Sequence, residues 1–160
     1  MPNILVMGLG NILLQDEGLG VRAMERLTSQ YRMQPEVQAI DGGTMGLDLL
    51  SRLDSVTALL ILDAVHTGQP PGSLVRLEGE AIPKALSLKM SMHQVGLQEL
   101  LAVSELQGTL PPRVVVWGME PGSLDWGLDL SSQVAGQLDD LVRAAAQELR
   151  DWGVRVEKGW

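Results

Sequence analysis

Apolar and polar positions follow two different spacings along the chain. Compact apolar runs predict strands, and the run at residues 56–63 is apolar enough for burial on both faces. Longer segments with apolar side chains three or four positions apart predict helices. The predicted strands are residues 3–9, 34–40, 56–63, 73–77 (an edge strand) and 113–118. The predicted helices are residues 16–31, 44–53, 93–106 and 131–152.

This alternation of strands and helices is typical of an α/β fold. Helices that connect parallel strands lie on both faces of the sheet, so we expect three layers around a mostly parallel, twisted sheet. A length of 160 residues fits one domain with its own core. We therefore expect residues 1–160 to form a single domain.

Composition removes several classes of function. The formal net charge of −8, without a basic stripe, argues against a nucleic-acid-binding protein. The absence of cysteine excludes disulfides, thiolate metal sites and thiol nucleophiles, so any metal must be held by oxygen and nitrogen. No apolar window approaches the roughly 20 residues of a membrane span, and the N-terminus does not resemble a signal peptide. We expect a cytoplasmic protein that binds no membrane.

Three residues suited to metal binding follow predicted element boundaries. Glu17 follows the turn after the first strand, Asp63 ends the apolar run 56–63, and His93 opens a predicted helix. Ligands of parallel α/β sheets bind beyond the carboxyl ends of the strands. Two carboxylates and one imidazole at that edge form a candidate three-ligand metal site with open coordination positions.

Each candidate ligand also has a simpler structural interpretation. Asp16 and Glu17 are both suited to a helix start, where the macrodipole favours carboxylates, and for Asp16 we prefer this role as the helix N-cap. Asp63 is suited to capping a helix in the turn that follows it, although a carboxylate after five apolar residues is costly unless paired or ligating. His93 is suited to a helix cap or a surface position. The residues alone leave these alternatives open.

Asp41 and His66 are two further polar residues in predicted turns or loops. Asp41 precedes a diglycine turn, where it is either an Asx-turn residue or a catalytic carboxylate. His66 lies in a polar loop and is expected to be exposed.

Gly8 and Gly10 begin a dinucleotide-binding fingerprint, but Leu13 stands where its third glycine is needed. The sequence has neither a Gly-x-Ser-x-Gly elbow nor a His-Glu-x-x-His motif.

Five segments resemble, in order, the motifs of one enzyme family. They are GLGNILLQDEGLGVR at residues 8–22, DGGT at 41–44, DAV at 63–65, SMHQVGL at 91–97 and WGLDLS at 126–131. Together they resemble the maturation endopeptidases of nickel–iron hydrogenases. The correspondence covers nearly the whole chain, and the opening motif is highly specific.

The resemblance implies a function and a set of site residues. It implies an endopeptidase that removes a short C-terminal extension from the precursor of the hydrogenase large subunit after nickel has been inserted. It implies Glu17, Asp63 and His93 as the metal-contacting residues. We expect Asp41 and Glu17 to be the catalytic residues and the protein to be a monomer whose partner is the precursor.

The resemblance leaves open whether the metal is bound by this protein alone or is carried by its substrate. Two carboxylates and an imidazole suit nickel, zinc or manganese. A resident zinc would make the protein an ordinary metallohydrolase. Nickel carried by the substrate would make the same residues a sensor of cofactor insertion, with zinc or another divalent ion as a surrogate, and we favour this case.

Two other classes of function compete with the endopeptidase. A receiver-like signalling domain also places acidic residues after its first and third strands, but it needs a lysine after its last strand, where Met119 and Glu120 stand. A non-catalytic chaperone for a metal-loaded partner fits the same residues, and cleavage by the purified protein would separate it from an enzyme.

Overall fold

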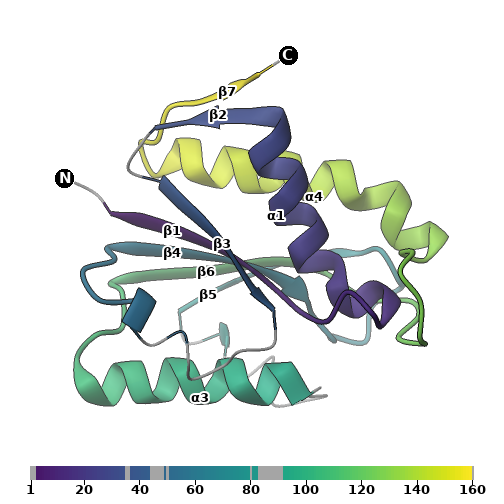
Figure 1. Ribbon diagram of the computed structural model, residues 1–160, viewed down its shortest axis with the longest axis horizontal. Helices are drawn as coiled ribbons and strands as arrows, with labels where there is room; N and C mark the ends of the chain where they lie inside the picture. Colours follow the sequence, from purple (N-terminus) through teal and green to yellow (C-terminus); the bar gives the residue numbers. More distant parts are fainter. Residues whose placement is uncertain are drawn as a thin grey trace.

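A five-stranded, mostly parallel sheet lies at the centre of the molecule (Figure 1). The computed structural model describes residues 3–34, 37–43, 49, 51–79, 81–82 and 92–159, with side chains except at 43 and 92–99. Across the sheet the strands are β3 (Val37–Gly43), β1 (Ile4–Leu9), β4 (Ala58–Ala64), β6 (Arg113–Met119) and β5 (Leu74–Glu78). Only β5 at the edge is antiparallel to its neighbour.

Helices cover both faces of this sheet. The described helical elements are the 3-10 turn η1 (Gln15–Gly18), α1 (Leu19–Gln30), α3 (Met92–Gln107) and α4 (Ser132–Asp151). Helices α1 and α4 pack on one face and α3 lies against the other (Figure 1). These three layers confirm the predicted α/β fold. No described helix is both long enough and apolar enough to cross a membrane.

The sheet has a core on each face because its central strands β1, β4 and β6 are apolar at nearly every position. In β1, Ile4 and Val6 pack toward α1 and α4, whereas Leu5 and Met7 belong to the core on the opposite face. Leu100 of α3 closes that second core. Successive strand residues point to opposite faces, so a continuous apolar run is what a strand between two helical layers requires.

The order of the strands places a switch point between β1 and β4. From β1 the chain moves outward to β3 and then crosses back to β4 on the other side of β1. From β4 it continues to β5 at the far edge and returns to β6, which lies between them. Ligands of open α/β sheets bind at such a point, beyond the carboxyl ends of the two strands. Gly20 of α1 permits close packing here, since a Cβ on it would lie 2.0 Å from the carbonyl oxygen of Leu62.

Several boundaries differ from the sequence predictions. The first helix begins at Leu19 and not at Asp16, which lies in η1 and does not cap α1. The second strand spans Val37–Gly43, so it begins within the predicted segment 34–40 and continues to Gly43. The predicted helix 44–53 falls largely outside the described residues.

One small sheet was not predicted. Strand β2 (Tyr31–Met33) follows α1 directly and pairs antiparallel with β7 (Val156–Lys158) near the C-terminus. The final helix agrees with prediction, and Ser131 is its N-cap, with the hydroxyl accepting from the Val134 N–H at 3.5 Å.

Candidate active site at the carboxyl edge of the sheet

Glu17 and Asp63 lie on the two sides of the switch point. Asp63 is near the end of β4, and Glu17 lies in η1, which contacts β4. The segment between β1 and η1 folds back tightly at Gly10, where φ is +119° and a Cβ would lie 1.8 Å from the carbonyl oxygen of Glu17. Only glycine fits that position, so the turn after β1 fixes the backbone of Glu17 against the strand end.

Both carboxylates are buried. Glu17 is 8% exposed and Asp63 is 1% exposed. The Asp63 Oδ1 accepts a hydrogen bond from the backbone N–H of Ala64 at 2.8 Å. No helix begins after Asp63, because residues 65–72 form a loop, so the helix-cap interpretation of this residue is wrong. Burial of two carboxylates at one sheet edge is costly unless they are paired or ligating, which is typical of a functional site.

Asp41 lies on the neighbouring strand. It is exposed, and it is aligned with Gly8 of β1 in the parallel pairing of β3 with β1. Its carboxylate therefore belongs to the same edge of the sheet as the segment that carries Glu17.

His93 lies outside the described side chains. Its helix, α3, begins at Met92, at the same end of the molecule as the start of α1 (Figure 1). Among the side chains that the structure describes, which exclude His93, no three histidine or acidic residues are grouped as a metal site requires. The convergence of Glu17, Asp63 and His93 therefore remains a prediction.

His66 is more buried than its loop position suggests. Its side chain is 19% exposed, and its Nδ1 lies 3.8 Å from the Oε2 of Glu120. The Oε1 of Glu120 accepts hydrogen bonds from the Thr67 N–H, the Thr67 hydroxyl and the Gln69 N–H. A buried carboxylate thus holds the loop after β4, and the prediction of an exposed His66 is wrong.

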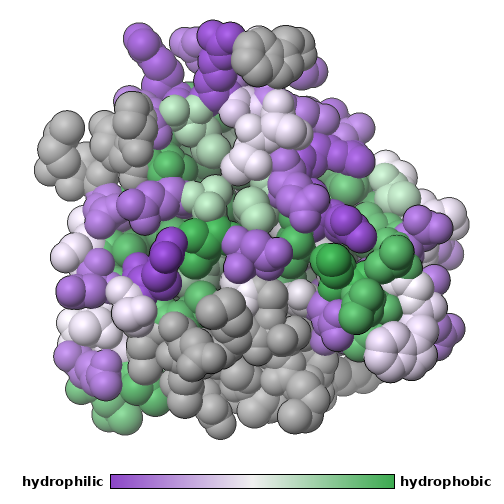
Figure 2. All heavy atoms as spheres, viewed as in Figure 1, coloured by the Kyte–Doolittle hydropathy of each residue, from purple (hydrophilic) through white to green (hydrophobic). Residues whose placement is uncertain are grey.

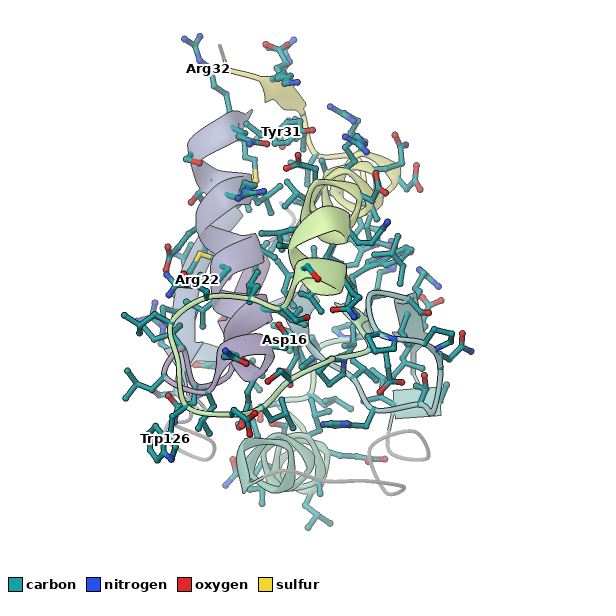
Figure 3. The ribbon with its side chains drawn as sticks, turned by 90° about the vertical axis from the view of Figure 1, so that its right-hand side faces the viewer. Asp16, Arg22, Tyr31, Arg32 and Trp126 are labelled. Atoms are coloured by element: carbon teal, nitrogen blue, oxygen red, sulfur yellow. The ribbon has the colours of Figure 1, made fainter. Side chains whose placement is uncertain are left out.

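Asp16 organises the other side of the edge, a role that sequence reasoning missed. Its side chain is fully buried and accepts four hydrogen bonds of 2.7–2.8 Å from the backbone N–H groups of Gly122, Ser123 and Ser131 and from the Ser131 hydroxyl. Figure 3 shows Asp16 inside the loop that joins β6 to α4. This β6–α4 loop, residues 120–131, is thereby fixed to the segment that carries Glu17.

Comparisons with known proteins agree with this architecture. The sequence pattern of the family described as hydrogenase maturation protease (HycI) matches residues 21–148. The chain is 42% identical over 158 residues to the hydrogenase expression/formation protein HupD of Rhodobacter capsulatus, across 98% of this chain and 75% of that protein. It is 35% identical to the hydrogenase 2 maturation protease of Escherichia coli, across 96% of this chain and 94% of that enzyme.

A solved structure gives the same answer. The hydrogenase maturating endopeptidase HybD from Escherichia coli superposes with a TM-score of 0.93 at 34% identity, over 99% of this chain and 98% of that chain. These similarities favour an enzyme over a receiver-like domain or a non-catalytic chaperone. The chain belongs to the hydrogenase maturation protease family and is an endopeptidase.

Proposed function

We propose that this endopeptidase removes the C-terminal extension from the precursor of the large subunit of a nickel–iron hydrogenase after nickel insertion. The observation that carries the proposal is the position of Glu17 and Asp63, buried on the two sides of the switch point between β1 and β4. Family membership supports the substrate class, because a relative that covers almost the same length is named as a hydrogenase 2 maturation protease.

Glu17, Asp63 and His93 are the proposed nickel contacts. Two carboxylate groups and one imidazole suit a borderline divalent ion, and a set of three leaves open positions for ligands that the substrate provides. In this proposal the nickel belongs to the substrate, and the enzyme recognises its presence when the buried carboxylates bind it. The rival is a resident zinc ion held by the same residues.

Asp41 is the proposed general base. Glu17 is the second proposed catalytic residue, and it acts through its contact with the nickel. An exposed carboxylate at the strand end next to β1 is accessible to a water molecule and to a peptide bond. In the proposed reaction, Asp41 accepts a proton from the water that adds to the scissile carbonyl carbon. The proton then passes to the leaving amine as the carbon–nitrogen bond breaks.

The test mixes the purified protein with nickel-loaded and nickel-free precursor and follows the released peptide by mass spectrometry. We expect cleavage of the nickel-loaded form alone, by an enzyme that itself copurifies with little metal. Efficient cleavage of nickel-free precursor by metal-stripped enzyme would exclude nickel recognition. Near-stoichiometric zinc in the active enzyme, with inactivation by a chelator, would favour the resident metal.

Single substitutions test the assigned residues. Glu17→Gln, Asp63→Asn and His93→Ala should each abolish cleavage, and Glu25→Gln, at an exposed position of α1, is the matched control. Asp41→Asn should lower the single-turnover rate at least about 100-fold, the usual contribution of a general base. Asp54→Asn, an exposed carboxylate in the loop before β4, is its control. An unchanged rate in Asp41→Asn would overturn the general-base role.

A further inference from the structure

Exposed apolar side chains gather on two loops beside the proposed site. The described residues include seven large apolar side chains that are exposed, and five of them lie in residues 11–15 or in the β6–α4 loop. These five form what we call the apolar platform: Ile12, Leu13, Leu124, Trp126 and Leu128. Figure 2 shows apolar residues gathered at the right-hand end of the molecule, where α1 begins in Figure 1. Concentration of this kind marks an interaction surface, since single exposed apolar residues are otherwise scattered.

The two loops are joined by backbone hydrogen bonds. Leu14 and Gly127 form a parallel bridge, in which the Gln15 N–H donates to the Gly127 carbonyl at 3.0 Å and the Gly127 N–H donates to the Leu13 carbonyl at 2.9 Å. Residues of the platform are therefore neighbours in space although more than a hundred positions separate them in the sequence.

The platform is also held in place from beneath. The four hydrogen bonds of Asp16 fix the β6–α4 loop, and in Figure 3 Trp126 stands at the outer end of that loop and points away from the body of the protein. Its residue is 79% exposed. A bulky ring on a fixed backbone loses little conformational entropy when a partner covers it, and tryptophan is enriched among the residues that dominate binding.

We propose that the apolar platform docks a stretch of the precursor polypeptide that carries apolar side chains next to basic ones. This inference rests on the proposed function. The platform is continuous with the site, because Leu13 lies four residues before Glu17 in the same segment. A polypeptide seated on the platform is thereby held beside the metal-contacting residues.

Charge identifies the basic component of the partner. The exposed Asp125 precedes Trp126, and the exposed Asp129 follows Leu128. The sequence has no lysine or arginine between Arg113 and Arg143. The charged side chains of this loop are therefore acidic, and one cation, Arg22 of α1, donates to the Leu128 carbonyl at 3.3 Å. The acidic side chains of the loop favour a basic segment. The same charges disfavour a second copy of this chain, since both copies would present acidic rims and each carries a formal net charge of −8.

The test compares cleavage of the nickel-loaded precursor by the wild type and by Trp126→Ala combined with Leu128→Ala. We expect KM to rise about tenfold or more while kcat stays within about twofold, because docking residues act before the chemical step. Leu106→Ala is the matched control, since Leu106 is 88% exposed on α3 and lies outside the platform; its KM should not change. Near-wild-type thermal unfolding of the double variant shows that the loop still folds.

The outcomes separate this inference from the proposed function. If the wild type does not cleave the precursor, the proposed function fails. If it does and the double variant keeps the wild-type KM, the docking surface alone is overturned.

Asp125→Asn with Asp129→Asn should raise KM and weaken the dependence of KM on salt, and an unchanged salt dependence would overturn the basic character of the docked segment. A wild-type dimer in sedimentation equilibrium that Trp126→Ala dissociates, with KM unchanged, would assign the platform to a second copy and overturn the proposal.

Discussion

Asp16 and Glu148 are both buried carboxylates that accept four hydrogen bonds, but their donors belong to different kinds of structure. Asp16 takes three of its four bonds from backbone N–H groups of the β6–α4 loop. Glu148 takes all four from side chains: two from Arg76, at 2.7 and 3.1 Å, and one from each indole of Trp117 and Trp152, at 2.8 and 2.9 Å.

The two clusters therefore differ in what they hold: the Glu148 cluster joins regular elements, whereas the Asp16 cluster fixes the shape of a loop. Arg76, Trp117 and Glu148 lie on β5, β6 and α4, so the Glu148 cluster fastens a helix to the edge of the sheet. The Asp16 cluster holds a loop by its backbone, and the side chains of Trp126 and Leu128 stay exposed. Backbone donors thus give a loop a fixed shape without using its recognition groups.

Among variants of these two clusters, Asp16→Ala should have the largest effect on both stability and activity. It leaves three part-buried backbone N–H groups without their acceptor, at about 1 kcal/mol each, so we expect the free energy of unfolding to fall by about 3 kcal/mol in a urea titration. Cleavage should also fall at temperatures where the variant remains folded, because the loop loses its attachment beside Glu17. A folded variant with wild-type KM would show that the platform does not depend on Asp16.

Glu148→Gln should reduce stability and leave catalysis unchanged. It removes the ion pair with Arg76 and weakens two indole hydrogen bonds, which should cost about 2 kcal/mol. The values of kcat and KM should match the wild type, since the Glu148 cluster does not belong to the platform or the site. The double variant Arg76→Met with Glu148→Gln should lose less than the sum of the two single variants. Strict additivity would contradict a coupled cluster.

The same glutamate should make stability depend on pH. Hydrogen bonding from Arg76, with further bonds from Trp117 and Trp152, holds the pKa of Glu148 below its ordinary value of 4.5. Because the folded-state pKa is the lower one, the charged carboxylate stabilises the folded protein above pH 4.5, and this contribution disappears as the pH falls through the folded-state pKa. The difference in free energy of unfolding between the wild type and Glu148→Gln should therefore shrink on acidification. Two parallel curves would contradict the assignment.

Sequence patterns predicted the sheet well because a strand buried on both faces is a continuous apolar run in the sequence. The apolar run before Asp63 specifies a central strand, and its place in an alternating order of strands and helices specifies the sheet edge at which Asp63 lies. The start of α1 was mispredicted for the opposite reason. Asp16 has the residue type of an N-cap, but its acceptor atoms are taken by residues 106 to 115 positions away, which no local pattern reveals.

Two other features left too little local signal. Strand β7 has three residues, of which only Val156 is buried, and β2 continues directly from the last turn of α1. Trp126 and Leu128 are apolar residues in a loop, and only the folded arrangement shows that they adjoin Ile12 and Leu13. Local sequence thus indicated the strands and candidate ligands, whereas long-range hydrogen bonds determined the shape of the edge.

Removing one donor from each cluster should give the smallest and most discriminating effects. Ser131→Ala deletes one hydroxyl bond to Asp16 and the N-cap of α4, and Trp152→Phe deletes one indole bond to Glu148, so each should lower the free energy of unfolding by about 1 kcal/mol. Only Ser131→Ala should raise KM for the precursor, because it loosens the loop that carries Trp126. Equal KM values in two equally destabilised variants would show that loop fixation makes no contribution to docking.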